Sequence, residues 1–413
     1  MVKKAQESSS KAQDTADRAA FWLTLTALGS GTVTLFVWLF SGREFVFSLE
    51  RMVTVMVITC PHALGLAVPL VVAVSTSLAA KRGLLIRDRT AFEKARGIDA
   101  VVFDKTGTLT EGSFGISEIV SLGDRSEEEI LELVAGLESR SEHSIARGIV
   151  KAAKDREVSF TEAKEFKAIP GKGAQGTVDG KNVKVVSPNY LKENQLNVDN
   201  NTLEKLSDQG RTVVFLLVDD RPEGAVALED IVRKESEKAV SGLKDMGLKV
   251  MMLTGDNQTV AKSVSGKLNL DDYFAEILPH DKASQIKQIK ERGMKVAMVG
   301  DGVNDAPALA EADVGIAIGA GTDVAMEAAD IVLVRSDPRD VISIIKLSSA
   351  TYSKMVQNLW WATGYNAIAI PLAAGILYPF FKFLLPPAAG AVVMSLSTVI
   401  VAFNAKLLST NES

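Results

Sequence analysis

Asp104, Thr254 and Asp301 share a sequence setting that suits catalysis. Each follows a short apolar run, respectively "AVVF", "VMML" and "VAMVG", of the kind that forms a buried parallel strand. The carboxyl ends of parallel strands meet at one edge of a sheet, where open α/β sheets place their binding sites. Lys282, in "LPHDKASQIK", lies between the second and third runs. We therefore expect these four side chains to converge.

The four residue types together suit the transfer of a phosphoryl group. A carboxylate such as Asp104 can act as the nucleophile, and a second one, Asp301, can hold Mg²⁺, which prefers oxygen ligands. The Thr254 hydroxyl and the Lys282 ammonium can neutralise phosphoryl oxygens. A single strand-end aspartate is often an ordinary turn residue, but three polar strand ends with a lysine favour catalysis.

Three motifs around these residues resemble those of a known family. "DKTGTLT" (104–110), "LTGDN" (253–257) and "MVGDGVNDAPAL" (298–309) are similar, in this order, to the phosphorylation domain of P-type ATPases, within the haloacid-dehalogenase-like superfamily. The resemblance implies a Rossmann-like α/β domain in which Asp104 becomes an aspartyl-phosphate. It implies that Asp104, Asp301 and the Thr106 carbonyl bind Mg²⁺. The further catalytic residues that it implies are Lys105, Thr254, Gly255, Asp256, Lys282 and Asp305, the last as a support of the loop.

The segment between the first two motifs is about 150 residues long, too long for a loop, so we expect an inserted α+β domain. Ser126 and Glu129 have the spacing of a capping box before an amphipathic helix. A second helix is expected to begin near Ser144. A hairpin with a type I′ turn is expected at Asp179-Gly180.

The insert also carries a candidate nucleotide site. "ESRSEHSIA" with "GKG" resembles the nucleotide-binding domain of the heavy-metal subclass of P-type ATPases, which implies ATP binding at Glu138, His143, Gly171 and Gly173. The family usually has proline after this histidine, whereas this chain has Ser144. An ordinary interhelix histidine is the alternative interpretation of His143. "GKGAQG" has the spacing of a dinucleotide fingerprint, but it precedes a hairpin instead of a helix, which argues against NAD or FAD.

Four apolar stretches are each long enough to cross a hydrocarbon core, which needs about 20 apolar helical residues. They are residues 21–40, 52–80, 357–378 and 383–405. We expect four transmembrane helices, with a buried core helix as the alternative for any one of them. The short outer loops hold only Arg43 and Lys382, so the positive-inside rule predicts a multi-pass cell-membrane protein with cytoplasmic soluble domains. The net charge of −5 does not favour a nucleic-acid partner.

The only cysteine, Cys60, lies in "CPH" inside the second apolar stretch. Pro61 breaks a helix interior, and irregular backbone at membrane depth persists only where it is buried or lines a cavity. Cys60 and His62 can point into one cavity, where a thiolate and an imidazole suit copper, with zinc as the rival. A helix kink with a buried cysteine is the alternative.

Two further membrane motifs accompany "CPH". With "N-x6-YN-x4-P" (358–371) and "P-x6-MS-x-STV" (387–399), it resembles the Cys-Pro-His subgroup of copper-transporting ATPases. The resemblance implies copper contacts for Cys60 and His62. The copper contacts that it adds are Tyr365, Asn366, Met394 and Ser395.

Members of this family also carry a further transmembrane block and an actuator domain with Thr-Gly-Glu, and no Thr-Gly-Glu occurs in this sequence. We therefore expect the C-terminal catalytic half of an ATP-driven copper-exporting P-type ATPase, which uses ATP and Mg²⁺. Its missing partner would be the N-terminal transmembrane and actuator segment. A zinc or other heavy-metal pump, a membrane-tethered dehalogenase-like phosphatase and a non-catalytic regulatory subunit are the alternatives.

The predicted architecture is a haloacid-dehalogenase-like phosphorylation domain with an inserted nucleotide-binding domain, flanked by transmembrane helices. The predicted division is a cytoplasmic linker (1–20), two transmembrane helices with Cys-Pro-His (21–80), the phosphorylation domain in two parts (81–113 and 223–345), the nucleotide-binding domain (114–222), and two transmembrane helices with a short tail (346–413).

Overall fold

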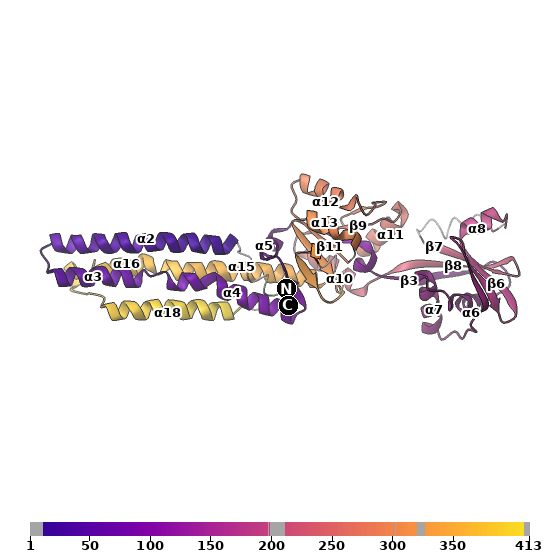
Figure 1. Cartoon of the computed structure of the whole chain (residues 1–413), viewed down its shortest axis with the longest axis horizontal. Coiled ribbons are helices and arrows are strands. Elements are labelled where there is room, and N and C mark those ends of the chain that lie inside the picture. Colours follow the sequence, from indigo (N-terminus) through magenta and orange to yellow (C-terminus); the bar gives the residue numbers. More distant parts are fainter. Residues whose placement is uncertain (1–10, 197, 199–210, 302, 320–326, 409–413) are drawn as a thin grey trace.

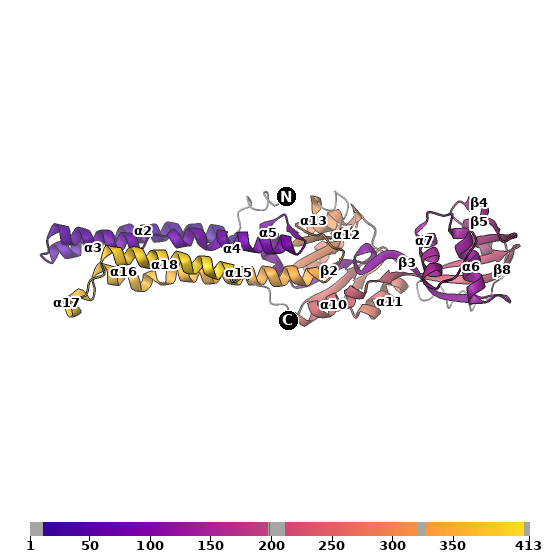
Figure 2. The ribbon, with the colours of Figure 1, turned by 90° about the horizontal axis from the view of Figure 1, so that it is seen from below.

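The computed structural model describes residues 11–196, 198, 211–301, 303–319 and 327–408. The molecule is elongated (Figures 1 and 2). A bundle of long helices forms one end, a mostly parallel sheet with its helices lies in the middle, and an antiparallel sheet forms the other end.

The central sheet has seven strands in the order β1-β13-β12-β11-β2-β9-β10, all parallel to their neighbours except β1. The strands are β1 (Leu84–Ile86), β2 (Ala100–Asp104), β9 (Lys249–Leu253), β10 (Asp272–Phe274), β11 (Val296–Gly300), β12 (Val314–Ile318) and β13 (Ile331–Leu333). The chain runs from β2 to β9 and β10 and then returns to β11 on the other side of β2. Ligand crevices open at such a reversal. The predicted Rossmann-like α/β fold is confirmed.

Helices cover both faces of this sheet. They are α5 (Arg89–Lys94), α10 (Lys234–Asp245), α11 (Gln258–Leu268), α12 (Lys282–Glu291), α13 (Ala306–Glu311) and the start of α15 (Asp340–Gly364). Val101 and Phe103 of β2 pack in one core with α10, α11 and α15. Ala100 and Val102 pack in the opposite core with α12 and α13. Because β2 is buried on both faces, its sequence is an uninterrupted apolar run.

The inserted domain is a six-stranded antiparallel sheet in the order β3-β8-β7-β6-β5-β4. Its elements are β3 (Thr110–Ser121), α6 (Glu127–Glu138), α7 (Ser144–Asp155), β4 (Lys164–Ile169), β5 (Gly173–Val178), β6 (Lys181–Val186), α8 (Pro188–Glu193), β7 (Thr212–Val218) and β8 (Arg221–Val232). In one core, α6 and α7 pack against the sheet. In a second, separate core, α8 packs against a different set of residues from the strands of the same sheet. The expected inserted α+β domain is confirmed.

Three local predictions in this domain are confirmed. Ser126 and Glu129 form the capping box, since the Ser126 N–H donates to Glu129 Oε2 at 2.8 Å and the Glu129 N–H donates to Ser126 Oγ at 3.2 Å. The second helix begins at Ser144. β5 and β6 form the hairpin, with left-handed φ values of 50° at Asp179 and 76° at Gly180, as a type I′ turn requires.

β3 and β8 form a long two-stranded connection between the two sheets (Figures 1 and 2). Thr110 pairs with Val232 at one end, and Ser121 pairs with Gly224 at the other. The predicted boundaries at 113/114 and 222/223 therefore fall within this connection. Since residues 225–228 are fully buried in the cores of the inserted domain, we propose that its C-terminal boundary lies near Glu229.

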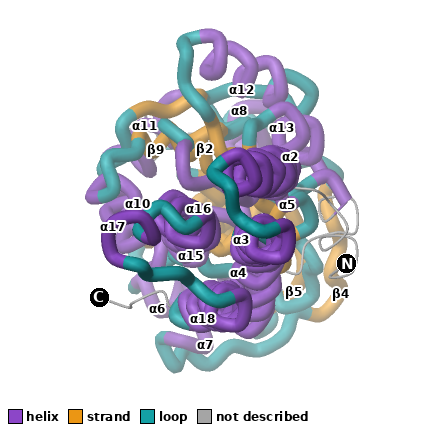
Figure 3. The backbone as a smooth tube through the Cα atoms, turned by 90° about the vertical axis from the view of Figure 1, so that its left-hand side faces the viewer, coloured by secondary structure: helices purple, strands orange, loops and turns teal. Residues whose placement is uncertain are grey.

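The helix bundle consists of α2 (Lys11–Phe40), α3 (Phe45–Ile58), α4 (His62–Lys81), the end of α15, α16 (Asn366–Ala374), α17 (Tyr378–Phe381) and α18 (Pro387–Lys406). Figure 3 shows these helices side by side, viewed along the bundle. Within the described part of the chain, three helical stretches are long and apolar enough to cross a membrane. They are Gln13–Phe40, Phe45–Lys81 and Pro387–Lys406.

These stretches correspond to three of the four predicted spans. The span expected at 357–378 is divided between α15, α16 and α17, since Tyr365 separates the first two and Gly375 ends α16 with a φ of 86°. A fourth crossing therefore stays a prediction. Residues 11–20 of the predicted linker are helical and continue directly into the first predicted span, because α2 includes both.

Gly148 on α7 and Gly266 on α11 provide a test of the inserted domain's packing. A Cβ at 148 would lie 2.2 Å from the Phe114 carbonyl oxygen, whereas a Cβ at 266 meets nothing within 4 Å. Glycine to alanine in a helix normally stabilises by about 1 kcal/mol. We expect Gly266→Ala to slow amide hydrogen exchange in α11 and Gly148→Ala to accelerate it in α7, as measured by mass spectrometry. Equal slowing in both helices would contradict the packing of α7 on β3.

Candidate active site

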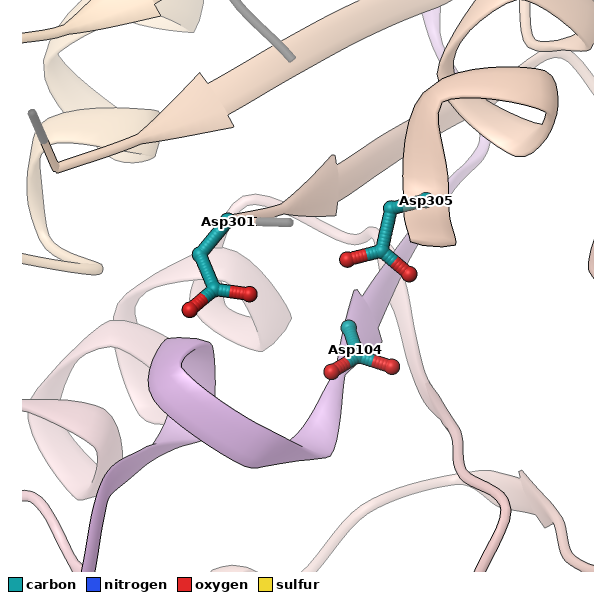
Figure 4. Close-up of side chains that lie close together, drawn as sticks. All are labelled: Asp104, Asp301 and Asp305. Atoms are coloured by element: carbon teal, nitrogen blue, oxygen red, sulfur yellow. The ribbon is translucent and has the colours of Figure 1, made fainter. Parts of the chain in front are cut away.

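Three carboxylates meet where β2 and β11 end (Figure 4). Asp104 is the last residue of β2, Asp301 follows β11, and Asp305 precedes α13. One oxygen of each carboxylate lies within 4.8 Å of the others. The neighbouring strands β2 and β11 thus bring together residues that are far apart in the sequence.

Lys282, the first residue of α12, provides the cation of this cluster. Its Nζ donates to Asp104 Oδ1 and to Asp305 Oδ1, each at 2.6 Å. The lysine is buried, as are both of these aspartates. Thr254 lies at the end of β9, on the other side of β2, and is 3% exposed. All four residues expected to converge therefore lie at the carboxyl ends of three adjacent strands or beside them.

The charges of this cluster do not balance. Three carboxylates lie around the Lys282 ammonium group, and the Arg233 guanidinium acts more weakly on Asp301. Burial, followed by repulsion from Asp305, raises the pKa of Asp104 to about 7, while Lys282 opposes the shift. Burial and Asp305 also raise the pKa of Asp301. Closely spaced carboxylate oxygens with excess negative charge fit a hard divalent cation such as Mg²⁺.

The loop after Asp104 admits Asp301 because residue 107 has no side chain. Gly107 has a φ of +77°, and a Cβ there would lie 1.8 Å from Asp301 Oδ2. Arg233 holds the loop, since its Nη2 donates to the Gly107 carbonyl at 3.0 Å and its Nε to the Thr108 carbonyl at 3.2 Å. Thr106 is exposed beside Gly107, and a contact of its carbonyl with Mg²⁺ stays a prediction.

Lys105 forms ion pairs with a second group of carboxylates. Its Nζ lies 2.5 Å from Asp256 Oδ2 and 3.3 Å from Asp230 Oδ2. Thr110 donates its hydroxyl to the same Asp230 oxygen at 2.6 Å. Burial raises the pKa of Asp230, and its contacts with Thr110 and Lys105 oppose the shift. The lysine therefore ties the loop after Asp104 to β8 and to the end of β9, where exposed Gly255 precedes Asp256.

Asp230 and Arg233 belong to this site although the sequence analysis did not single them out. Both lie at the end of β8 or directly after it, in "ALEDIVR". The sequence does contain a signal for these two residues, because the apolar run before them ends in an acid and a base, as the other strands of the site end in polar residues. Their role could not be inferred from it, because Lys105, the partner of Asp230, and Gly107, the partner of Arg233, are distant in the sequence.

A cavity of about 480 Å³ lies in the inserted domain. All four residues predicted to bind ATP line it, namely Glu138, His143, Gly171 and Gly173. Apolar side chains complete the wall, including Phe166, Ile169, Val185 and Val214. A largely apolar cavity of this size with a few polar groups is typical of small-molecule sites.

The polar residues of this cavity have distinct local environments. Glu138 ends α6, and burial raises the pKa of its carboxyl to about 7, while a hydrogen bond with Ser141 opposes the shift. His143 caps α7, where its Nδ1 accepts the Ile145 N–H at 3.3 Å. A Cβ at residue 173 would lie 2.0 Å from the Val185 carbonyl oxygen, so the turn into β5 requires glycine there.

The helix break predicted at Pro61 is confirmed, since α3 ends at Ile58 and α4 begins at His62. The Tyr365 hydroxyl donates to the Ile58 carbonyl at 3.1 Å. The tyrosine therefore provides a hydrogen-bond partner for a carbonyl group at the end of a helix. Inside a membrane, such backbone groups need a partner within the protein. The helices on either side of the break pack on three others of the bundle, because α3 and α4 both contact α18, α16 contacts α3 and α15 contacts α4.

Asn366 is the polar residue at this break that lacks partners. It is 3% exposed, and neither of its amide atoms has a hydrogen-bond partner among the described residues. A buried amide without partners is costly, so the position suits a ligand. Met394 is half-buried on α18, whereas Ser395 is exposed and donates its hydroxyl to the Ala391 carbonyl of its own helix at 2.9 Å.

Cys60 and His62 differ from the expectation, because both side chains are exposed. The described helices therefore do not enclose them in one cavity. Ile58 and Ala63, on either side of the break, are buried in the bundle, whereas the two residues of the motif between them remain accessible.

Comparisons with known proteins agree with this geometry. Residues 98–313 match the family model of haloacid dehalogenase-like hydrolases. A copper-exporting P-type ATPase B from Archaeoglobus fulgidus is 62% identical over 408 residues, covering 99% of this chain and 59% of that protein. A solved zinc-transporting PIB-type ATPase in the E2·Pi state has a TM-score of 0.83 at 30% identity, covering 99% of this chain and 66% of that one. The solved catalytic domain of a CPx-ATPase, CopB-B, has a TM-score of 0.52 at 33% identity, covering 65% of this chain and 98% of that one.

The fold is thus that of a haloacid dehalogenase-like hydrolase, and the three carboxylates lie within the matched residues. The chain belongs to the heavy-metal P-type ATPases of this superfamily. The predicted family and fold class are confirmed. The chain spans about three fifths of the length of the Archaeoglobus relative.

Gly107 and Gly180 provide a matched test of the site. Both have positive φ, but a Cβ at 180 meets nothing within 4 Å, whereas one at 107 collides with Asp301. We expect Gly107→Ala to abolish phosphorylation of the chain by ATP while nucleotide binding is unchanged. Gly180→Ala should retain both. Acid-precipitated radiolabel and a fluorescent nucleotide titration measure the two properties, and normal phosphorylation of Gly107→Ala would contradict the placement of Asp301.

Proposed function

We propose that the chain is the catalytic part of an ATP-driven copper exporter that works through a phosphorylated aspartate. The observation that carries the proposal is the buried cluster of Asp104, Asp301 and Asp305 around Lys282, at the switch point of the sheet. The similarity to a protein named as a copper-exporting P-type ATPase supports the choice of cargo. Zinc is the second candidate, since a zinc-transporting ATPase is structurally similar at lower identity.

In the proposed reaction an Asp104 carboxylate oxygen bonds to the γ-phosphorus of ATP. The bond between that phosphorus and the β,γ-bridging oxygen breaks, and ADP leaves. Lys282 and Thr254 neutralise phosphoryl oxygens, and Asp305 holds Lys282 in place. Lys105, Gly255 and Asp256 keep the loop after Asp104 against the end of β9.

Mg²⁺ is assigned to Asp104, Asp301 and the Thr106 carbonyl. The donor set fits, because hard oxygen ligands with excess negative charge suit this ion. When bound, the ion would offset the charge of the carboxylates and of the phosphoryl oxygens. Gly107 allows Asp301 to reach this position.

ATP is assigned to the cavity of the inserted domain. Glu138, His143, Gly171 and Gly173 line it, and Gly171 has a φ of +69° with open space where a side chain would be. Open backbone of this kind lets a ligand approach closely. Figure 1 shows the inserted domain joined to the central sheet through β3 and β8, so ATP must bridge the two domains for its γ-phosphate to reach Asp104.

Copper is assigned to the break between α3 and α4 as the cargo. Cys60, His62, Asn366 and Met394 are the proposed ligands, with Tyr365 and Ser395 as further candidates. The unpartnered amide of Asn366 supports this choice. Because Cys60 and His62 are exposed, we propose that further membrane helices cover them in the complete pump, whose actuator domain would also release the phosphate. We place the pump in the cell membrane with its soluble domains in the cytoplasm.

Asp104→Asn tests the nucleophile. We expect this variant to bind ATP as the unchanged chain does, because the nucleotide cavity is in the other domain, but to form no acid-stable phosphoenzyme. Asp245→Asn, at an exposed carboxylate that ends α10, is the control and should be phosphorylated normally. Acid-gel radiolabelling with γ-labelled ATP measures both variants. Incorporation of label into Asp104→Asn would refute the proposed nucleophile.

The choice of metal is tested by binding to the chain in lipid nanodiscs. We expect Cys60→Ser and Met394→Leu each to weaken Cu(I) binding at least about tenfold, roughly 1.4 kcal/mol, because each removes a soft sulfur ligand. Met355→Leu, a buried methionine outside the proposed ligands, should have no effect. Competition with a chromophoric Cu(I) chelator measures the affinities. Tight Zn²⁺ binding with no Cu(I) preference, unchanged by Met394→Leu, would favour the zinc pump.

A further inference from the structure

A sizeable cavity takes no part in the proposed phosphoryl transfer. This junction cavity has a volume of about 450 Å³ and lies where the central sheet domain joins the helix bundle. Its wall combines the start of α2, residues of α5 and the turn after it, Lys295 before β11, and the middle of α15. Figures 1 and 2 both show α5 beside these parts of α2 and α15. Its volume suits a small organic group.

The floor of the junction cavity is apolar and leads toward the membrane. Met355, Val356 and Leu359 of α15 form it. Trp360 and Trp361 follow directly along the helix and are 73% and 56% exposed. Exposed tryptophans collect at the level of lipid headgroups. The junction cavity therefore lies at the proposed cytoplasmic surface of the membrane, with its apolar floor on the lipid side.

Basic side chains form the rim of the junction cavity. Lys94, Arg96 and Lys295 line it, and all three are exposed. The Arg96 guanidinium also stacks on Tyr352 of α15, with its central carbon 3.5 Å from the ring centroid. The aromatic ring holds this cation above the apolar floor, where an anionic group can meet it.

The two acidic residues of the wall already have positive or donor groups beside them. Glu93 Oε1 lies 3.7 Å from Nε of Arg89, which is 1% exposed and whose guanidinium nitrogens have no hydrogen-bond partner among the described residues. Asp313 Oδ2 accepts the Val296 N–H at 3.0 Å. Since buried Arg89 offsets Glu93, the three exposed cations determine the sign of the potential at the rim.

We propose that the junction cavity binds an anionic phospholipid of the cytoplasmic leaflet. Its phosphate contacts Lys94, Arg96 and Lys295, and the first part of an acyl chain lies on Val356 and Leu359. Basic pockets beside transmembrane helices at this membrane surface are suited to such headgroups. A free anion would use the cations but not the apolar floor, so the combination favours a lipid.

The proposed lipid would contact helices that are connected to the central sheet domain. The cavity wall includes both α5 and α15, and these helices are already joined, since Ser348 of α15 donates its hydroxyl to the Phe92 carbonyl at 2.6 Å. α15 continues into the core that also contains Phe103 of β2. A lipid that contacts both helices therefore stabilises the joint between the membrane bundle and the sheet that carries Asp104.

Native mass spectrometry of the 413-residue chain tests the lipid site. The chain is supplied with phosphatidylglycerol and phosphatidylcholine in equal amounts. We expect one phosphatidylglycerol to be retained preferentially, and a triple variant, Lys94→Gln, Arg96→Gln and Lys295→Gln, to lower its retention at least fivefold. The matched control removes three other exposed cations near the membrane, in Lys81→Gln, Lys346→Gln and Lys406→Gln, and should retain the lipid. Excess glycerol 3-phosphate should not displace it.

Equal retention of the two lipids, or equal losses in the two triple variants, would overturn the proposal. Displacement by glycerol 3-phosphate would overturn the lipid in favour of a free phosphate site. A second measurement needs no variant, because Trp360 and Trp361 lie next to the apolar floor. Phosphatidylglycerol with brominated acyl chains should quench tryptophan fluorescence in nanodiscs more than brominated phosphatidylcholine at the same content. Equal quenching by the two lipids would also contradict the site.

Discussion

The crowding of carboxylates at the end of β2 is the constraint on which the rest of the structure depends. Asp104, Asp301 and Asp305 lie together, and Lys282 forms ion pairs with Asp104 and Asp305. Like charges so close in a buried position are costly, and the raised pKa of Asp104 expresses that cost. The sheet holds them there because β2 and β11 are neighbours, and because Gly107 leaves room for Asp301. In the proposed reaction, a bound cation would offset part of the negative charge of these carboxylates, and the phosphoryl group would be transferred to one of them.

One helix connects this constraint to the membrane. Val341 of α15 packs in the same core as Phe103, and farther along the helix the Asn358 amide donates to the Ala67 carbonyl of α4 at 3.0 Å. Asn404 of α18 donates in turn to Asn358 at 2.8 Å. α15 therefore contacts the core beneath Asp104 and also the helix that begins with His62. This arrangement offers a physical route between the proposed phosphorylation site and the proposed metal site.

Patterns formed by residues close together in the sequence predicted much of the fold. The strands before Asp104 and Asp301 were recognisable because strands buried on both faces are uninterrupted apolar runs. The Ser126 capping box and the Asp179 turn depend only on residues within a few positions. Contacts between distant segments were not predictable in the same way.

The pairing of Lys105 with Asp230 joins two strands that only the folded sheet brings together. The exposure of Cys60 likewise depends on which helices pack beside α3 and α4, which its own motif does not specify. The nucleotide residues were identified by family resemblance, and their common cavity became visible only when β5 and α7 were placed together.

The most direct measurement identifies the phosphorylated residue chemically. The chain is incubated with Mg²⁺ and ATP, quenched in acid and treated with borohydride, which reduces an acyl phosphate to an alcohol. We expect Asp104 alone to be converted to homoserine in peptide mass spectra, and hydroxylamine treatment beforehand to prevent the conversion. Conversion at Asp301 or Asp305, or an unmodified Asp104 in a chain that has incorporated the γ-phosphate, would contradict it.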